Sequence, residues 1–191
     1  MPRRLIVGIS GSSASQLGVT LLKALRACSE IETHLVVSAG ASHTLRFEAG
    51  LDVKDVEAMA DYAYSPSDLL AVISSGSFIT AGMVVIPCSM RTLGAIATGN
   101  SQDLLTRAAD VCLKERRKLV LVTRESPLNL VHIKNMEAVT LAGAIVQPPV
   151  VAFYHRPETI EDMLGQIVGK VLDQFGIEHN LFKRWEGSAG F

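Results

Sequence analysis

Three short segments combine hydroxyl side chains with small residues, and each follows an apolar run of the sequence. They are residues 10–18, 38–42 and 88–92. Small residues let the backbone approach an anion, while hydroxyl groups and the N–H groups at a helix start can donate hydrogen bonds to it. The first segment matches neither GxGxxG nor GxxxxGKS/T, which disfavours dinucleotide and Walker-type nucleotide sites. We therefore expect a phosphate at the first loop and one extended ligand shared by several loops.

Charged side chains suggest a second anion site. Arg107 and Lys114 are seven residues apart, on one face of a helix predicted for residues 101–114, and together they could hold an anion. Cations near a helix C-terminus also simply complement the helix dipole, so that interpretation stays open. Arg124 and Glu125 directly follow a later apolar run, where they form either part of a site or a strand-end ion pair.

Other side chains have simpler interpretations. Glu48 lies alone near the end of a predicted helix, where a glutamate is usually a solvated charge. Cys88 has no assignable histidine or cation beside it, so we expect a small buried core thiol. Residues 152–157 are aromatic and basic and could stack on a planar ligand or an unsaturated chain. Because HExxH and GxSxG are absent and the five histidines are scattered, the sequence predicts neither a metal site nor a Ser-His-Asp triad.

Wholly apolar, β-branched runs predict the strands that position these side chains. They span residues 5–9, 34–37, 83–86, 118–122 and 144–146, and each indicates a strand covered on both faces. The clearest helical period between or after them covers residues 159–175, with Thr159 as its cap and Gly176 at its end. This alternation predicts an α/β fold with a doubly wound parallel sheet, Rossmann-like or flavodoxin-like. Such sheets bind ligands beyond the carboxyl ends of their strands, where the polar segments lie.

The composition fits one globular domain over residues 1–191, with residues 177–191 as a C-terminal tail. Lys+Arg number 18 and Asp+Glu 19, a net charge of −1 that disfavours nucleic acid as a partner. The three cysteines form no CxxC, which predicts reduced thiols and a cytoplasmic location. No apolar run approaches the roughly 18 residues of a membrane span, and the first is too short for a signal peptide.

Several motifs, in order along the chain, resemble the UbiX-type flavin prenyltransferases, a family associated with hydroxybenzoate and phenolic acid decarboxylation and with ubiquinone biosynthesis. The resemblance runs from the Gly8-Ile-Ser-Gly loop to Trp185. Its most specific elements are Ile73-Ser-Ser-Gly-Ser-Phe, Gly82-Met-Val-Val-Ile-Pro-Cys-Ser-Met, Arg107-Ala-Ala-Asp-Val-Cys-Leu-Lys-Glu-Arg-Arg, Leu119-Val-Leu-Val-Thr-Arg-Glu and Ala152-Phe-Tyr-His-Arg-Pro.

The resemblance implies a flavoprotein that joins the dimethylallyl group of dimethylallyl phosphate to N5 and C6 of reduced FMN. The residues implied to bind FMN are Ser10, Gly11, Ser12, Ser13, Ser38, Ser89, Met90, Arg91, Thr92 and Arg124. Those implied to bind or surround dimethylallyl phosphate are Arg107, Lys114, Tyr154 and Lys170. It further implies a homododecamer with the site where subunits meet, no metal, and delivery of prenylated FMN to a UbiD-type decarboxylase.

The residue types suit that chemistry. Cations such as Arg107 and Lys114 could stabilise a departing phosphate, and the Tyr154 face could shield an allylic cation. Ring closure must remove a proton, for which the candidates are Glu125, Glu48, Ser13 and the released phosphate.

The chain departs from the family pattern in the first loop and at residues 39 and 170. Ala14 and Ser15 stand where relatives commonly have Gly and Ala, which puts the conformation of the first loop in question. Ala39 stands where Lys is common, and Lys170 stands where Arg is common. At position 170 a guanidinium that can donate two parallel hydrogen bonds is thus replaced by a single ammonium group.

Two alternative functions use the same loops. One is a flavin-dependent cysteine decarboxylase, although the loop at residues 87–92 lacks the Asn of that group. The other is a non-catalytic FMN-binding subunit of a decarboxylase.

Overall fold

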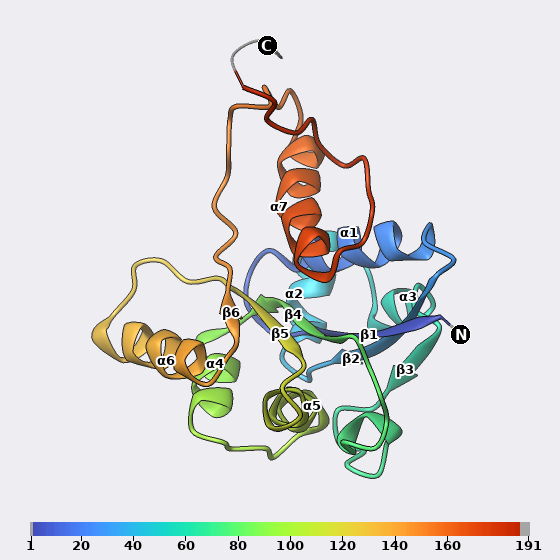
Figure 1. Ribbon diagram of the computed structural model, residues 1–191, viewed down its shortest axis with the longest axis vertical. Helices are drawn as coiled ribbons and strands as arrows, with labels where there is room; N and C mark the ends of the chain where they lie inside the picture. Colours follow the sequence, from blue (N-terminus) through green and yellow to red (C-terminus); the bar gives the residue numbers. More distant parts are fainter. Residues whose placement is uncertain (1, 188–191) are drawn as a thin grey trace.

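Six parallel strands form one sheet in the order β3-β2-β1-β4-β5-β6 in the computed structural model, which describes residues 2–187 (Figure 1). The strands are β1 (Arg3–Ile9), β2 (Ile31–Val37), β3 (Tyr62–Tyr64), β4 (Gly82–Cys88), β5 (Lys118–Thr123) and β6 (Ile145–Val146). Each of the five predicted apolar runs lies in or overlaps one of these strands. The predicted doubly wound parallel sheet is therefore confirmed.

Helices connect the strands and cover both faces of the sheet. They are α1 (Ser15–Arg26), α2 (Ala41–Thr44), the π-helical turn η1 (Leu45–Ala49), α3 (Val53–Glu57), the 3₁₀ turn η2 (Val72–Ser74), α4 (Met90–Ala97), α5 (Leu104–Lys114), α6 (Leu130–Leu141) and α7 (Ile160–Phe175). The predicted α7 is confirmed at both ends, because the Thr159 side chain accepts from Asp162 N and Gly176 has a left-handed φ of 62°. The helix predicted for residues 101–114 begins later, at Leu104, where Asp103 caps it.

Two apolar cores lie on opposite faces of the sheet. Alternate residues of β1 divide between them: Leu5 and Val7 pack with α1 and α7, whereas Ile6 packs with α4 and α5. Figure 1 shows α7 and α1 on one side of the sheet and α5 and α4 on the other. Burial on both faces explains why the strand sequences are continuously apolar rather than alternating.

The sequence did not predict β3 or α6. Strand β3 has only three residues, which pair with β2. Side chains add to this pairing: the Tyr64 hydroxyl lies 2.8 Å from His34 Nδ1, and the Tyr62 and His34 rings stack at 4.9 Å. Helix α6 carries apolar residues around its circumference, so no stripe marks it; Leu130 is 64% and Leu141 81% exposed. Within residues 2–187, no helix is both long enough and apolar enough to cross a membrane.

Candidate active site

The loops after β1 and β4 meet where the sheet changes direction. From β1 the chain winds outward through β2 and β3, then returns to β4 on the other side of β1. Ser10, fully buried, joins the two loops: its Oγ donates to the Pro87 carbonyl at 2.8 Å and accepts from Ser89 N at 2.8 Å. Such a switch point is where open parallel sheets bind ligands.

Two more loops adjoin this pair at the same edge. Ser38 N donates to Ile9 O at 2.9 Å, and Arg124 N donates to Cys88 O at 3.1 Å. The backbones of Gly11 and Gly40 lie so close that a Cβ on Gly11 would be 2.7 Å from the Gly40 carbonyl. Residues 10–14, 38–41, 88–92 and 123–126 together form what we call the four-loop edge. The expectation that these predicted segments lie side by side is confirmed.

The four-loop edge offers unused hydrogen-bond donors. Among residues 2–187, the N–H groups of Gly11 and Ser13 have no acceptor, and the buried Ser12 hydroxyl has no partner. Ser89 caps α4, with its Oγ accepting from Thr92 N at 3.2 Å and donating to Thr92 Oγ1 at 3.0 Å. The remaining first-turn N–H groups of α4 are the kind of donors that hold a phosphate. This donor set fits FMN.

Glu48 occupies the start of α1, which corrects one expectation. Its Oε2 accepts from Ala14 N at 2.8 Å, from Ser15 N at 3.1 Å and from the Ser15 hydroxyl at 3.2 Å. A phosphate at this helix start is therefore disfavoured, because a carboxylate already accepts from the Ala14 and Ser15 N–H groups and would repel a second anion. Glu48 is not a free solvated charge but a capping group supplied from another element.

The surroundings of Glu48 hold it in its charged form. Partial burial raises the pKa of its carboxyl, but hydrogen bonding from the Ser13 hydroxyl, from Ser15 and from Ala14 outweighs burial and brings the pKa below its ordinary value. Two of the three side chains predicted to accept a proton, Glu48 and Ser13, thus lie together at the first loop. Glu48 is ionised at neutral pH.

Replacing Glu48 by glutamine should lower the stability of the fold by about 1 kcal/mol at neutral pH, since it removes a charged helix cap. A carboxyl whose pKa is lowered on folding stabilises above its unfolded pKa and loses that contribution as the pH falls through its folded pKa. The difference between wild type and Glu48→Gln should therefore shrink as the pH falls below about 4. Urea unfolding at several pH values measures it, and a pH-independent difference would contradict the capping role.

Ala14 adopts a left-handed conformation, with φ 74° and ψ 36°, at the residue before α1. The first loop therefore keeps a conformation suited to glycine, the residue that is common in the family at this position, although this chain has alanine there. The added hydroxyl at Ser15 is used, because it lies 3.2 Å from Thr44 O and from Glu48 Oε2. The first loop is thus held by strained backbone and by polar contacts to residues 44–48.

Restoring glycine at position 14 should raise the free energy of unfolding by about 0.5–1 kcal/mol, because it relieves a left-handed alanine while making the unfolded chain more flexible. Ala24→Gly, inside α1, is the matched control and should instead destabilise by about 0.5–1 kcal/mol. Chemical denaturation of both variants tests this. Equal destabilisation by the two substitutions would show that position 14 carries no strain.

Arg124 and Glu125 lie at the end of β5 with exposed side chains. Ser126 N donates to Glu125 Oε1 at 3.1 Å, and no salt bridge joins the two side chains in the described part of the chain. The strand-end ion pair that the sequence allowed is therefore absent from residues 2–187. Both side chains are available at the four-loop edge.

Arg107 and Lys114 are not brought to the four-loop edge within one protomer. Arg107 Nε donates to Ser74 O at 3.2 Å, and its Nη1 pairs with Asp110 at 2.8 Å. Lys114 ends α5 and pairs with Glu115, close to where β5 begins, so it lies at the opposite edge of the sheet. A role for Lys114 in the site requires a second copy of the chain.

Tyr154 and Lys170 also lie apart from the four-loop edge. The segment between β6 and α7 runs away from the sheet to the start of α7 (Figure 1). Tyr154 has edge contacts with His155 at 5.5 Å and with Trp185 at 6.1 Å, and Lys170 Nζ lies 3.3 Å from Asp173 Oδ2. None of their described polar or ring contacts reaches the four-loop edge of the same protomer.

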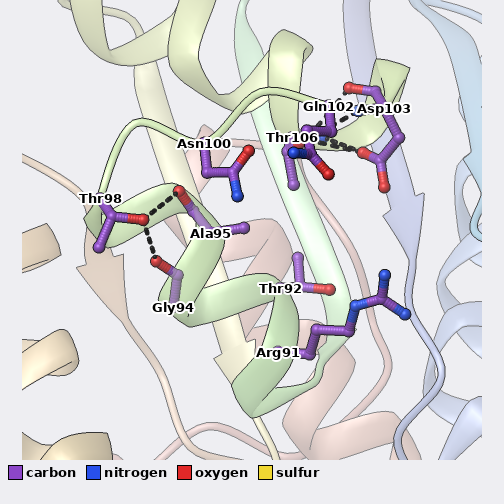
Figure 2. Close-up of a pocket in the computed structure, with 9 residues that line it drawn as sticks. All are labelled: Arg91, Thr92, Gly94, Ala95, Thr98, Asn100, Gln102, Asp103 and Thr106. Carbon is purple, nitrogen blue, oxygen red and sulfur yellow. Dashed lines mark hydrogen bonds between the residues drawn. The ribbon is translucent and has the colours of Figure 1, made fainter.

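A polar pocket of about 240 Å³ lies between α4 and α5. Figure 2 shows Arg91 and Thr92 on one side of it and Asp103 and Thr106 on the other. Because Arg91 and Thr92 were expected to bind FMN, this pocket extends the four-loop edge past the start of α4. No sequence pattern pointed to the residues on the α5 side of this pocket, such as Asp103 and Thr106.

Cys88 is not a nucleophile at neutral pH. It is fully buried, and burial raises the pKa of its thiol to about 12, as expected for a core cysteine. Within residues 2–187, no group of three or more His, Cys, Asp or Glu side chains is arranged to hold a metal ion.

Sequence reasoning missed residues that shape the loops rather than face a ligand. Gly40 makes room for Gly11, and Gln16 Nε2 donates to Glu48 O at 2.8 Å. No sequence pattern indicated that the Ser10 hydroxyl joins two loops; its expected contact with FMN stays a prediction. Side chains of this kind leave no motif, because their roles depend on which distant loop lies beside them.

The family model for flavoproteins matches residues 1–172. A probable UbiX-like flavin prenyltransferase of Sedimentibacter hydroxybenzoicus is 55% identical over 185 residues, covering 97% of this chain and 98% of the relative. The flavin prenyltransferase UbiX of Escherichia coli is 51% identical over 188 residues, covering 97% and 100%.

Among solved structures, AnUbiX (PadA1) in complex with FMN and dimethylallyl pyrophosphate has a TM-score of 0.96 at 48% identity, covering 98% of this chain and 99% of that one. The peptidyl-cysteine decarboxylase EpiD has a TM-score of 0.62 at 18% identity, covering 80% and 84%, and it shares the fold alone. The matched motifs, the sheet order and these likenesses agree. The chain belongs to the UbiX-like flavin prenyltransferase family.

Proposed function

We propose that this protein transfers the dimethylallyl group of dimethylallyl phosphate to reduced FMN and forms bonds at flavin N5 and C6. The observation that carries this proposal is the four-loop edge, where unused donors lie beside a half-buried, ionised Glu48 and an available Glu125. The relative bound to FMN and dimethylallyl pyrophosphate has nearly the same backbone. The product would supply a UbiD-type decarboxylase.

FMN would be held by the four-loop edge. With the start of α1 taken by Glu48, its phosphate would be held by the first-turn N–H groups of α4, next to Ser89 and Arg124. The first loop would then hold the flavin ring through the N–H groups of Gly11 and Ser13. Reduced FMN supplies the nucleophilic nitrogen and carbon of the reaction.

The remaining residues divide between binding and proton transfer. When the allylic carbon–oxygen bond breaks, inorganic phosphate leaves, and cations must stabilise it. Forming the first bond releases the N5 proton. When the second bond forms, the prenyl double bond takes up a proton and C6 loses one, which Glu125, the Ser13–Glu48 pair or the phosphate must accept. The Tyr154 ring would shield the cationic prenyl group.

A complete site would need several copies of the chain, because Lys114 lies at the opposite edge of its own sheet. A UbiX-like protein of Escherichia coli with a TM-score of 0.94 is described as dodecameric, and we propose the same assembly here. Exposed apolar side chains on α6, such as Val131 at 64% exposure, supply surface for such contacts. The three free cysteines support a cytoplasmic location.

Parallel anaerobic incubations test the reaction class. Protein treated with chelator and mixed with reduced FMN receives dimethylallyl phosphate, dimethylallyl diphosphate or a peptide ending in cysteine. We expect release of inorganic phosphate from the first substrate without added metal. Loss of CO₂ from the peptide would favour the cysteine decarboxylase, and flavin binding without turnover of any substrate would favour the non-catalytic subunit.

A further inference from the structure

The chain after α7 returns along that helix in a groove made by two glycines. A Cβ on Gly169 would fall 2.5 Å from the Phe182 ring and 2.6 Å from His179. A Cβ on Gly165, one turn earlier on the same face, would lie 3.0 Å from Leu181 O. Residues 177–187, which we call the tail, are irregular but closely seated, and Figure 1 shows them beside α7.

The Asp173 carboxylate, on α7, anchors the tail to that helix. Arg184 Nη2 donates to its Oδ1 at 2.7 Å and Nη1 to its Oδ2 at 3.1 Å, a bidentate pair. His179 Nε2 lies 3.2 Å from Oδ1. The Asp173 side chain is only 20% exposed, and hydrogen bonding from Arg184 is the main reason that its pKa falls to about 2. Its charge therefore persists throughout the physiological range.

The Arg184–Asp173 ion pair also positions aromatic rings of the tail. Trp185, the next residue, meets the Tyr154 ring edge-on at 6.1 Å. Phe182, under the Arg184 guanidinium at 5.3 Å, meets His155 at 6.4 Å. The ion pair thus connects α7 to the segment that carries the proposed prenyl-binding tyrosine.

The same ion pair affects Lys170. Its Nζ lies 3.3 Å from Asp173 Oδ2, longer than the 2.7–2.9 Å typical of a charge-assisted hydrogen bond. Because the Arg184 guanidinium donates to both carboxylate oxygens at 2.7 and 3.1 Å, Lys170 is the weaker of the two cationic partners of Asp173. Without Arg184, Asp173 would compete more strongly with a substrate phosphate for the Lys170 ammonium.

We propose that the Arg184–Asp173 ion pair is a latch that seats the tail against Tyr154 and keeps Lys170 available to the substrate phosphate. Arg184 and Asp173 are positioning residues in this account. The inference rests on the proposed function for its substrate, whereas the seating of the tail is a property of the protein alone.

The single tryptophan of the chain, Trp185, gives a readout that does not need activity. Arg184→Gln should increase acrylamide quenching of its fluorescence and raise the KM for dimethylallyl phosphate about tenfold, with FMN affinity unchanged. Arg184→Lys should restore part of both. Arg26→Gln, at the exposed end of α1, is the matched control and should change neither.

Gly169→Ala provides a second variant, since it displaces Phe182 and His179 without removing a charge. It should also increase quenching. Wild-type quenching in both variants would overturn the latch, and so would increased quenching with an unchanged KM. Failure of the wild-type protein to prenylate FMN would sink the proposed function instead, and the fluorescence comparison would still decide whether the latch seats the tail.

Discussion

Replacing Glu125 by glutamine should slow prenyl transfer by about 10²–10⁴, the usual range for loss of a positioned acid or base. The substitution keeps the size of the side chain and its acceptor for Ser126 N, but it removes the anion that accepts the proton. Glu125 is exposed at the four-loop edge and is not used in a salt bridge within residues 2–187. FMN affinity should change little, so single-turnover rates with saturating flavin are the measurement.

Glu137→Gln, on the exposed surface of α6, is the matched control and should keep the wild-type rate. A wild-type rate in Glu125→Gln would show that Glu125 is not the base. Proton acceptance would then pass to the Ser13–Glu48 pair or to the released phosphate. Loss of flavin with an unchanged single-turnover rate would instead make Glu125 a structural residue.

Adding one methyl group at Gly11 should weaken FMN binding by about 5- to 150-fold. The new Cβ would lie 2.7 Å from both the carbonyl carbon and the oxygen of Gly40, and 3.0 Å from its Cα, so two loop backbones must move apart. Overpacking of this kind costs about 1–3 kcal/mol. Flavin fluorescence titration of Gly11→Ala measures the loss.

Gly40→Ala offers the reciprocal control across the same contact. A Cβ on Gly40 would have only Gly11 Cα within reach, at 3.7 Å, an ordinary van der Waals distance. We therefore expect near wild-type affinity from Gly40→Ala. Equal losses in the two variants would mean that the close approach of these loops does not shape the flavin site.

The fold was largely predictable because burial on both faces makes the strands continuously apolar. Leu5 and Ile6 face different cores, yet both must be apolar, and the resulting runs are easy to find. Strand β3 was missed because its three residues are too few to show an apolar run or an alternating pattern. Helix α6 was missed because its apolar residues face several directions.

The candidate site was predictable in its parts but not in its arrangement. Parallel topology alone brings the loops after β1, β2, β4 and β5 to one edge, so the polar segments could be grouped in advance. The contact between Glu48 and Ala14 spans 34 residues and depends on a π-helical turn. No local sequence pattern predicts either the contact or the turn. In the proposed assembly, the positions of Lys114 and Tyr154 relative to the loops would depend on subunit contacts, which a single sequence does not specify.

In the proposed reaction, the four-loop edge holds reduced FMN as a substrate that gains a prenyl group. Mass spectrometry of the flavin extracted after anaerobic incubation with dimethylallyl phosphate tests it most directly. We predict a flavin heavier by one five-carbon unit, formed in equal amount to the phosphate released and strongly reduced in Gly11→Ala at limiting FMN. Recovery of unmodified FMN from wild-type protein that binds both ligands would contradict the claim.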